Sequence, residues 1–297
     1  MKLTILSIIT HLSTIPAMLA AEIAWNKVDS WAYQLCNYTN DTLDEITSSQ
    51  FDLVVIDLSR NGQSDFFKRA EIEAVQQSNK LVLAYFEIGA IEQYRPEWND
   101  VPKDLKAGRV ANWPKEQYVK FWDERWWPIV RSRIDQALTA GFNGAYLDMV
   151  TTYAEIPNTE LKEEERAHKM VELIERISTY AKTKDPSFKI VPQNCPELYT
   201  WSYSEPKLNQ KYINAIDGLG LESVFFMAHD RPAQHQWSVE NRKNAIAIKA
   251  ANKLVLGVDY AKKVTSIRQA YQKQRALGFI PYVSVETLEV LQIKNSF

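Results

Sequence analysis

The stretch GFNGAYLDMV, residues 141–150, carries a single carboxylate, Asp148, in an otherwise apolar segment. Glycines bound the segment, and its short apolar run is typical of a strand that is buried on both faces. An unpaired charge inside such a strand would cost several kcal/mol. The presence of Asp148 therefore indicates a fold in which this strand ends at an open rim, where the carboxylate can reach solvent or a partner.

Seven other segments resemble this one, and helix-like segments alternate with them along the chain. The expected strands cover residues 31–38, 51–59, 80–89, 142–150, 188–195, 217–226, 253–261 and 279–287. Strand followed by helix, eight times, predicts an α/β fold that is a single (β/α)8 TIM barrel. The alternative is an open doubly wound sheet. When that fold binds nucleotides it has a glycine-rich turn after its first strand, where this chain has NYTND.

Composition and the N-terminus set the cellular context. Lys and Arg number 35 against 37 Asp and Glu, so the net charge of -2 gives no indication of a nucleic-acid or acidic-membrane partner. Met1-Lys2 and the apolar residues 3–21 resemble a signal peptide (1–21) that is cleaved near Ala20 or Ala21. A membrane anchor and a packed helix are the alternatives. We expect a secreted or periplasmic protein, with residues 22–297 as one barrel domain and no other membrane span.

The cysteine and histidine content points to no metal or cofactor. Cys36 and Cys195 fall on the first and fifth expected strands, on opposite walls of a barrel, so we expect two free thiols. The chain lacks CxxC and HExxH and has only four histidines, which argues against a zinc site. Magnesium held by three rim carboxylates stays open as an alternative, although no phosphate-binding glycine loop accompanies it.

Polar residues gather at the ends of the expected strands, where TIM barrels carry their chemistry. A single strand-end carboxylate often caps a helix or pairs with a cation, but several on one rim favour a metal site or acid/base chemistry. These rim residues are Asp57, Glu87, Glu92, Arg95, Asp148, Asn194, Glu222, Asp259, Tyr260 and Glu286.

Two of the carboxylates, Asp148 and Glu222, are suited to face each other across the barrel. Glycoside hydrolysis needs such a pair, one to protonate the leaving oxygen and one to attack or to activate water. The other rim residues would then tune pKa values or bind substrate. The long connection 90–121 carries Tyr94, Trp98 and Trp113, which either stack on sugar rings or pack the connection onto the barrel.

The order of these motifs resembles glycoside hydrolase family 114, the endo-α-1,4-polygalactosaminidase-like barrels. The resembling segments are WAYQLCNY, FDLVVIDLS, YFEIGAIEQYR, WPKEQYVKFWDERWW, GFNGAYLDMV, VPQN, GLGLESVFF and VLGVDYA. The resemblance implies hydrolysis of an α-1,4-linked galactosamine or N-acetylgalactosamine polysaccharide, with Asp148 and Glu222 as the catalytic carboxylates. It also implies a polysaccharide as the partner and no cofactor.

The chain departs from the family pattern at Asn143, Ala90, Thr151 and Cys195. These departures reduce the number of acids at the rim and favour a more acetylated or different glycan. A non-catalytic carbohydrate-binding barrel and a metal-dependent lyase or isomerase remain as alternatives. The sequence makes no prediction of the oligomeric state.

Overall fold

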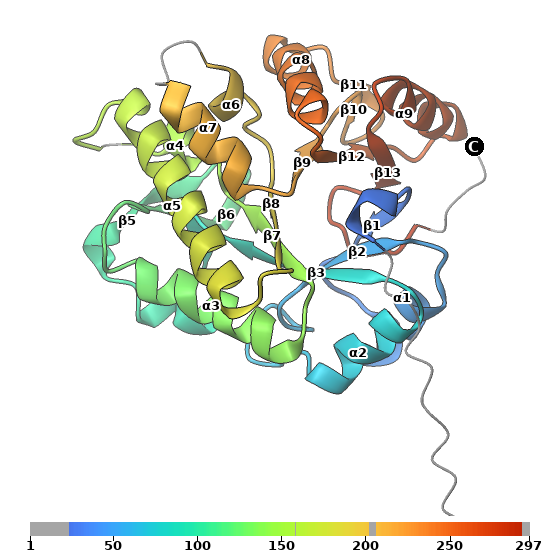
Figure 1. The fold of residues 1–297 in the computed structure, drawn as a ribbon, viewed down its shortest axis with the longest axis horizontal. Coiled ribbons are helices and arrows are strands. Elements are labelled where there is room, and N and C mark those ends of the chain that lie inside the picture. Colours follow the sequence, from blue (N-terminus) through green and yellow to red (C-terminus); the bar gives the residue numbers. More distant parts are fainter. Residues whose placement is uncertain (1–23, 158, 202–205, 293–297) are drawn as a thin grey trace, which may run out of the picture.

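The computed structural model describes residues 24–157, 159–201 and 206–292 (Figure 1). Eight parallel strands lie at its centre, at the places that the apolar segments predict but shorter than those segments. They are β1 (Trp31–Tyr33), β2 (Leu53–Asp57), β3 (Leu81–Glu87), β7 (Gly144–Asp148), β8 (Lys189–Pro192), β9 (Gly218–Glu222), β12 (Leu254–Tyr260) and β13 (Ile280–Ser284).

Two parallel sheets make up the barrel wall. One has the order β1-β2-β3-β7-β8 and the other the order β13-β12-β9. A parallel bridge between Gln193 and Gly220 joins β8 to β9, and the backbone N–H of Asn194 donates to the carbonyl of Gly220 at 2.8 Å. On the other side, the indole N–H of Trp31 on β1 donates to the carbonyl of Ile280, the first residue of β13, at 2.8 Å. The arrangement confirms the predicted TIM-barrel class.

Helices surround these strands (Figure 1). The helices that follow strands are α1 (Asp44–Ser48), α2 (Arg69–Gln77), α3 (Trp127–Ala140), α5 (Glu163–Lys184), α7 (Pro206–Ala215), α8 (Gln236–Ala250) and α9 (Val264–Ala276), with two single turns at α4 (Thr152–Glu155) and α6 (Glu197–Thr200). The expectation of eight strand-helix repeats differs from the structure in one respect. After β13, residues 285–292 contain no helix.

Aromatic side chains fill the barrel interior. The rings of Trp31, Tyr33 and Tyr146 lie 5.1–6.1 Å apart, and Tyr282 lies 5.7 Å from Trp31. Such rings bury a large apolar area and favour offset or tilted contacts at these separations. Gly220 leaves room for them, because a Cβ there would lie 1.9 Å from the hydroxyl oxygen of Tyr146.

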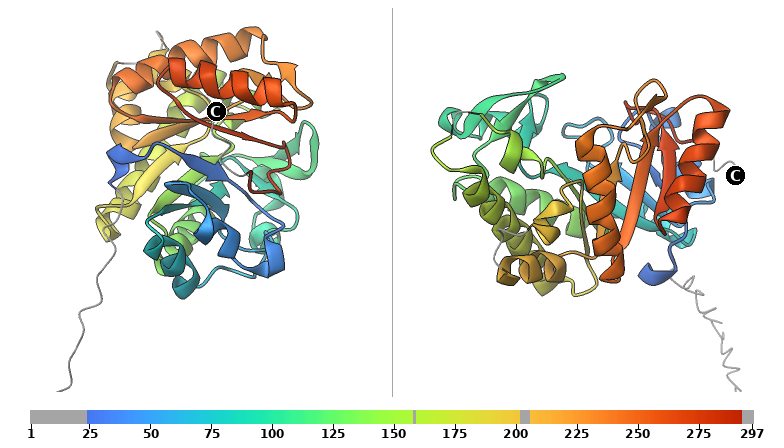
Figure 2. Two further views of the ribbon diagram at one scale, coloured as in Figure 1. Left: turned by 90° about the vertical axis from the view of Figure 1, so that its right-hand side faces the viewer. Right: turned by 90° about the horizontal axis from the view of Figure 1, so that it is seen from above.

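The long connection after β3 is not the loop that the sequence predicts. It folds into an antiparallel sheet of order β4-β6-β5, and we call residues 90–119 the excursion. Its strands are β4 (Ala90–Glu92), β5 (Lys106–Val110) and β6 (Trp113–Val119), with 3-10 turns at Pro96–Asn99 and Lys103–Leu105. Figure 2 shows the excursion on the side of the barrel away from α9.

Two other sequence expectations concern the cysteines and the membrane. Cys36 is exposed, Cys195 is buried, and both are free thiols. Within the described residues, no helix is both long and apolar enough to cross a membrane. The expected signal peptide, residues 1–21, lies outside the described part of the chain.

Candidate active site

Asp148 ends β7 and is held in one orientation by two hydrogen bonds. The hydroxyl of Tyr85 on β3 donates to its Oδ2 at 2.7 Å, and the backbone N–H of Met149 donates to its Oδ1 at 2.6 Å. The side chain is half-buried, at the C-terminal end of the barrel strands that we call the mouth. Asp148 is therefore positioned at the open rim that its sequence context requires.

Glu222 ends β9 and is surrounded by donors from three side chains. The hydroxyl of Tyr260 donates to its Oε1, while the amides of Gln193 and Asn194 donate to its Oε2, the latter at 3.0 Å. Gln193 is itself fixed, because the hydroxyl of Tyr33 donates to its Oε1 at 3.0 Å. Three donors on one carboxylate are the surroundings of an anion.

Asp148 and Glu222 interact electrostatically. Burial raises the pKa of Asp148 to about 7, and the negative charge of Glu222 adds to the rise. The hydrogen bonds from Tyr85 and from the backbone of Met149 oppose it. A carboxyl group whose pKa lies near 7 beside a negatively charged carboxylate is an arrangement that acid/base catalysis uses.

The backbone is unusual immediately after these strand ends. Met149, Asn194 and Ser223, none of them glycine, have φ values of 59°, 63° and 50°. The left-handed region is costly for such residues and persists where surrounding structure enforces it. The three strained positions directly follow Asp148, Gln193 and Glu222, which supports a functional role for this rim.

Four of the expected rim residues form a buried ion cluster instead of a free surface. Arg95 donates from Nη1 to Oδ1 of Asp57 at 2.9 Å and pairs through Nη2 with its Oδ2 at 2.8 Å. The same guanidinium contacts Glu87 at 2.9 Å and Glu92 at 2.6 Å. Arg133 of α3 adds a second cation, 3.2 Å from Glu87.

Within this cluster, the pKa values of the neighbouring residues Glu87 and Glu92 shift in opposite directions. Burial would raise the pKa of Glu87, but Arg95, a hydrogen bond with Glu92 and Arg133 outweigh it and lower the pKa to about 2. Burial raises the pKa of Glu92 well above its usual range, and the charge of Glu87 adds to the rise. Tyr94 donates its hydroxyl to Glu92, at the edge of this cluster.

For Glu87 and Asp259 the structure corrects the predicted substrate contact. Both side chains are fully buried. Asp259 accepts the backbone N–H groups of Phe225 and Phe226 at 2.7 and 2.8 Å and the amide of Gln274 at 2.8 Å. Asp259 therefore anchors the loop after β9, and Glu87 neutralises buried arginines. A strand-end position in the sequence does not reveal whether a carboxylate faces the mouth.

The other expected binding residues differ in exposure. Tyr94 is 42% exposed and Trp113 is 53% exposed, so both offer ring faces to solvent. Trp98 is partly buried, and the ammonium of Lys106 lies 3.7 Å from its ring centroid, which favours the packing alternative for this residue. Glu286 is exposed beyond β13.

Three residues around the pair are not among the expected site residues, although one of them, Gln193, stands at an expected strand end. Tyr85 and Gln193 contact Asp148 and Glu222 directly. Glu116 on β6 is buried, and burial together with the charges of Glu87 and Asp148 raises its pKa to about 9. Two-residue alternation along β3 and β8 could have indicated Tyr85 and Gln193. Glu116 stands in a polar segment that gave no such signal.

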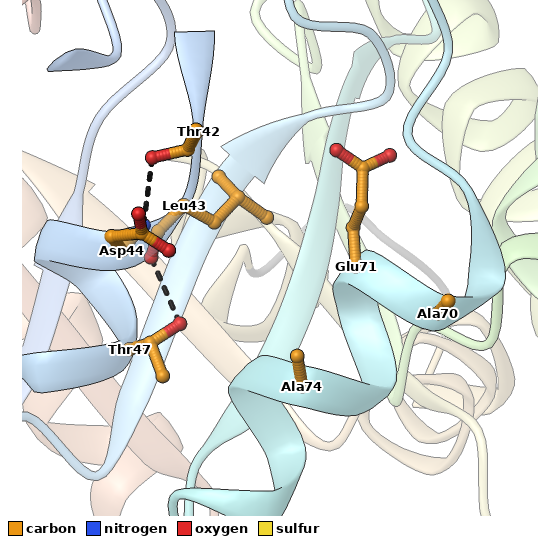
Figure 3. A pocket seen from close by; sticks show the side chains of 7 residues that line it. All are labelled: Thr42, Leu43, Asp44, Thr47, Ala70, Glu71 and Ala74. Atoms are coloured by element: carbon orange, nitrogen blue, oxygen red, sulfur yellow. Dashed lines mark hydrogen bonds between the residues drawn. The ribbon is translucent and has the colours of Figure 1, made fainter. Parts of the chain in front are cut away.

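Two surface pockets lie away from Asp148 and Glu222 and contain none of the residues around them. One lies between α2 and the segment of α1 with its preceding loop, and it is lined by Thr42, Leu43, Asp44, Thr47, Ala70, Glu71 and Ala74 (Figure 3). Another is lined by residues of α3 and α5 around Trp127 and Tyr180. Among the described residues, no group of three or more His, Cys, Asp or Glu side chains is arranged to hold a metal ion.

Comparison with known proteins places the chain in a family of enzymes. The model of glycoside-hydrolase family GH114 matches residues 14–296, so the chain belongs to this family and is a glycoside hydrolase. Uncharacterised proteins of Deinococcus radiodurans and Methanocaldococcus jannaschii are each 30% identical to it. The matches cover 90% and 89% of this chain, and 84% and 78% of those proteins.

Solved structures share the fold at low identity. Ega3 of Aspergillus fumigatus, determined in complex with galactosamine, is 15% identical with a TM-score of 0.69, covering 92% of this chain and all of that one. The glycoside hydrolase domain of PelA from Pseudomonas aeruginosa is 15% identical with a TM-score of 0.70, covering 89% and 97%. These likenesses support the TIM-barrel fold.

Proposed function

We propose that this glycoside hydrolase cleaves an α-1,4-linked polysaccharide of galactosamine or N-acetylgalactosamine, with Asp148 and Glu222 as its catalytic carboxyl groups. One observation carries the proposal. The two are half-buried at the ends of β7 and β9, each is oriented by hydrogen bonds, and the charge of Glu222 helps to raise the pKa of Asp148 to about 7.

The reaction needs one protonated and one ionised carboxyl group. One donates a proton to the glycosidic oxygen as its bond to the anomeric carbon breaks, and the other attacks that carbon or deprotonates a water that does so. Because the pKa of Asp148 is raised to about 7 beside the negative charge of Glu222, both forms are present together in part of the molecules at neutral pH. Tyr85, Tyr260 and Asn194 keep the two carboxyl groups in place.

The proposed substrate follows from the family and from the charge of the mouth. Ega3, which shares the fold, was determined with galactosamine. Beside the pair, Glu116 is a further carboxyl group, without a partner cation of its own, that can pair with a cationic amino sugar once it has lost its proton, whereas Glu92 is already paired with Arg95. Asn143, a departure from the family pattern, does not reduce this set. It lies beside the first residue of β7, and its Oδ1 accepts the backbone N–H of Val82 at 2.8 Å.

The other substrate-binding assignments stay part of the proposal. Tyr94 and Trp113 are exposed and can stack on sugar rings. Arg95 and Asp57 support the mouth from within. We also propose that residues 22–297 form the working domain and that the chain is exported.

The test uses the chain from Glu22 onward and galactosamine polymers of graded acetylation. Released oligosaccharides are measured by mass spectrometry for the parent and for Asp148→Asn and Glu222→Gln, with Glu172→Gln on the exposed face of α5 as the control. We expect products from the parent and the control, and losses of about 10²- to 10⁴-fold in the two mouth variants with unchanged circular dichroism. No product from any polymer by the folded parent would refute the substrate assignment.

A second measurement separates the acid from its partner. On an aryl glycoside whose leaving group needs no protonation, a variant that lacks the general acid keeps much of its activity. A variant that lacks the nucleophile or base loses it on both substrates. Equal activity of Asp148→Asn and Glu222→Gln to the parent on both substrates would contradict the paired-carboxyl mechanism.

A further inference from the structure

In the part of the chain that the structure describes, Glu116 is a glutamate near the pair whose carboxyl group has no hydrogen-bond or ion-pair partner. Its side chain is 8% exposed. No hydrogen bond or ion pair joins its carboxyl group to another side chain or to the backbone in the described residues, whereas Glu87 and Glu92 both contact Arg95. The carboxyl oxygens of Glu116 keep contact with solvent, since they are not among the fully buried atoms that lack a partner. A largely buried carboxyl group that the protein leaves to solvent is available to a ligand, and such groups persist where function requires them.

Strand geometry places this carboxyl group on the side of the excursion that faces the catalytic pair. Glu116 and Tyr118 lie two residues apart on β6, so they share one face of the strand. Tyr118 packs in a cluster with Met149, the neighbour of Asp148, and donates its hydroxyl to Glu155 of α4 at 3.0 Å. Glu116 therefore faces the turn that carries Asp148.

The antiparallel register brings a second glutamate to the same face. Glu92 of β4 is the Cα partner of Glu116. Directly opposed residues in an antiparallel pair have neighbouring side chains, and like charges there repel. Four charged or titratable side chains act on Glu116. Three are acidic: Glu87 of β3, Asp148 of β7 and Glu155 of α4. The one cation is Arg95, which follows β4.

From this placement we propose that Glu116 is a specificity residue that receives the ammonium group of a free amino sugar, releasing its own proton to solvent as the substrate binds. The neutral carboxyl group gives up H⁺, and the carboxylate pairs with the substrate –NH3⁺, so charge and atoms balance. An N-acetylated sugar carries no such cation and leaves Glu116 protonated. The inference rests on the proposed glycosidase function only for the identity of the ligand.

Proton release gives the proposal its own readout. The pKa of Glu116, raised to about 9 by burial and by Glu87 and Asp148, means that it is protonated in the free protein at pH 7. An ammonium group in contact lowers the pKa of a carboxyl group. Binding of a free-amine ligand at pH 7 should therefore release a proton, and this release should fade as the pH rises above about 9.

The experiment is calorimetric titration in phosphate and in Tris buffer at pH 7, where the difference in heat counts the protons. The ligands are a galactosamine oligosaccharide and its fully N-acetylated counterpart. A Glu222→Gln background prevents hydrolysis. In that background we compare unchanged Glu116, Glu116→Gln and, as the matched control, Glu172→Gln on α5, whose side chain is 51% exposed.

We expect about one proton per free-amine ligand with Glu116 and with the control, and close to none with Glu116→Gln. Affinity for the free amine should fall about tenfold or more in that variant, while affinity for the acetylated ligand stays within about twofold. Equal proton release with and without Glu116, or no binding of the free amine to the parent background, overturns the proposal. Since the readout is binding, failure of hydrolysis in the wild type is a separate result.

Discussion

At the scale of single residues, the mouth depends on hydrogen bonds that set when Asp148 loses its proton. The bond from Tyr85 is one of the two that lower the pKa of Asp148, which burial and Glu222 raise to about 7. In Tyr85→Phe this bond is lost, so the pKa of Asp148 should rise further. A lost hydrogen bond of about 0.5–1.5 kcal/mol corresponds to a rise of up to about one pKa unit.

The measurement is the pH profile of kcat/KM on an oligosaccharide substrate. We expect the limb of the pH profile that reports ionisation of Asp148 to move to higher pH in Tyr85→Phe. Tyr180→Phe is the matched control, because its hydroxyl donates to Asp135 at 2.9 Å on the outer helices. A limb that stays in place or moves to lower pH would show that Tyr85 does not hold the Asp148 carboxylate.

A second residue-scale prediction concerns stability at Glu116. The folded pKa of Glu116 is about 9, against about 4.3 in an unfolded chain. Between these values the folded protein holds a proton that the unfolded chain has lost, so this group's contribution to stability falls as pH rises through the window. Glu116→Gln removes that dependence.

Urea denaturation at about pH 5 and about pH 8 tests this sign. The variant should differ little from the parent at the lower pH, and it should be more stable at the higher pH by on the order of 1–3 kcal/mol. Such a gain from removing a carboxyl group would fit a residue kept for function at a cost to the fold. A variant that is less stable than the parent at the higher pH would count against a buried, unpaired Glu116.

At the scale of elements, the ion cluster ties the excursion and α3 to the barrel. Arg133 of α3 donates to the carbonyl oxygen of Glu87 at 2.7 Å and contacts its carboxylate at 3.2 Å. Arg133→Met leaves Glu87 buried with one cation fewer. Breaking a buried ion pair by removing one partner costs about 3–5 kcal/mol, and we expect a loss of that size in urea denaturation.

Arg131→Met is the control, since Arg131 is exposed on the same helix and should change stability by less than about 0.5 kcal/mol. The pH gives an independent check. Because the pKa of Glu87 is lowered to about 2, its contribution to stability is present above about pH 4.3 and is lost as pH falls toward 2. Comparable stability of the Arg133 and Arg131 variants would show that Arg95 alone neutralises Glu87.

The excursion is the part of the fold that the sequence does not predict. The barrel strands were found because their apolar runs, such as LVVID and LVLAYFE, are unlike their surroundings. β6 reads WPKEQYV, with proline and three polar residues, and nothing in it marks a strand. Its partner β4 lies well before it in the sequence, and only β5 precedes it directly, across the turn at Ala111 and Asn112. Glu116 was missed for the same reason, because its burial is a product of that pairing.

At the scale of the whole molecule, the barrel class and the position of Asp148 and Glu222 at strand ends could be predicted, but not the partners of each rim residue. Asp148 and Glu222 end their strands, and the fold brings such ends together. Asp259 also lies near a strand end, yet it points into the protein and anchors a loop. Which carboxylates stay free depends on Arg95 and Arg133, whose positions follow from tertiary packing.

The last prediction follows from how charge is distributed over the molecule. The whole chain has a net charge of only -2, so a long-range field is weak. Near the mouth, by contrast, negative charge at pH 7 lies on Glu222 and, because its pKa is about 7, in part on Asp148, whereas Glu116 is protonated until a cation binds. Attraction of a cationic polymer should therefore be local and sensitive to salt. The Debye length falls from about 30 Å to about 3 Å between roughly 0.01 M and 1 M salt.

We expect kcat/KM for a deacetylated galactosamine polymer to fall several-fold over that range of salt, because screening weakens the encounter with the mouth. The fully acetylated polymer, which carries no ammonium groups, is the control and should change little. Initial rates at low substrate concentration measure both. If salt slowed the two polymers equally, the carboxyl groups of the mouth would not be attracting the amine. The discrimination would then have to arise from contacts made after binding.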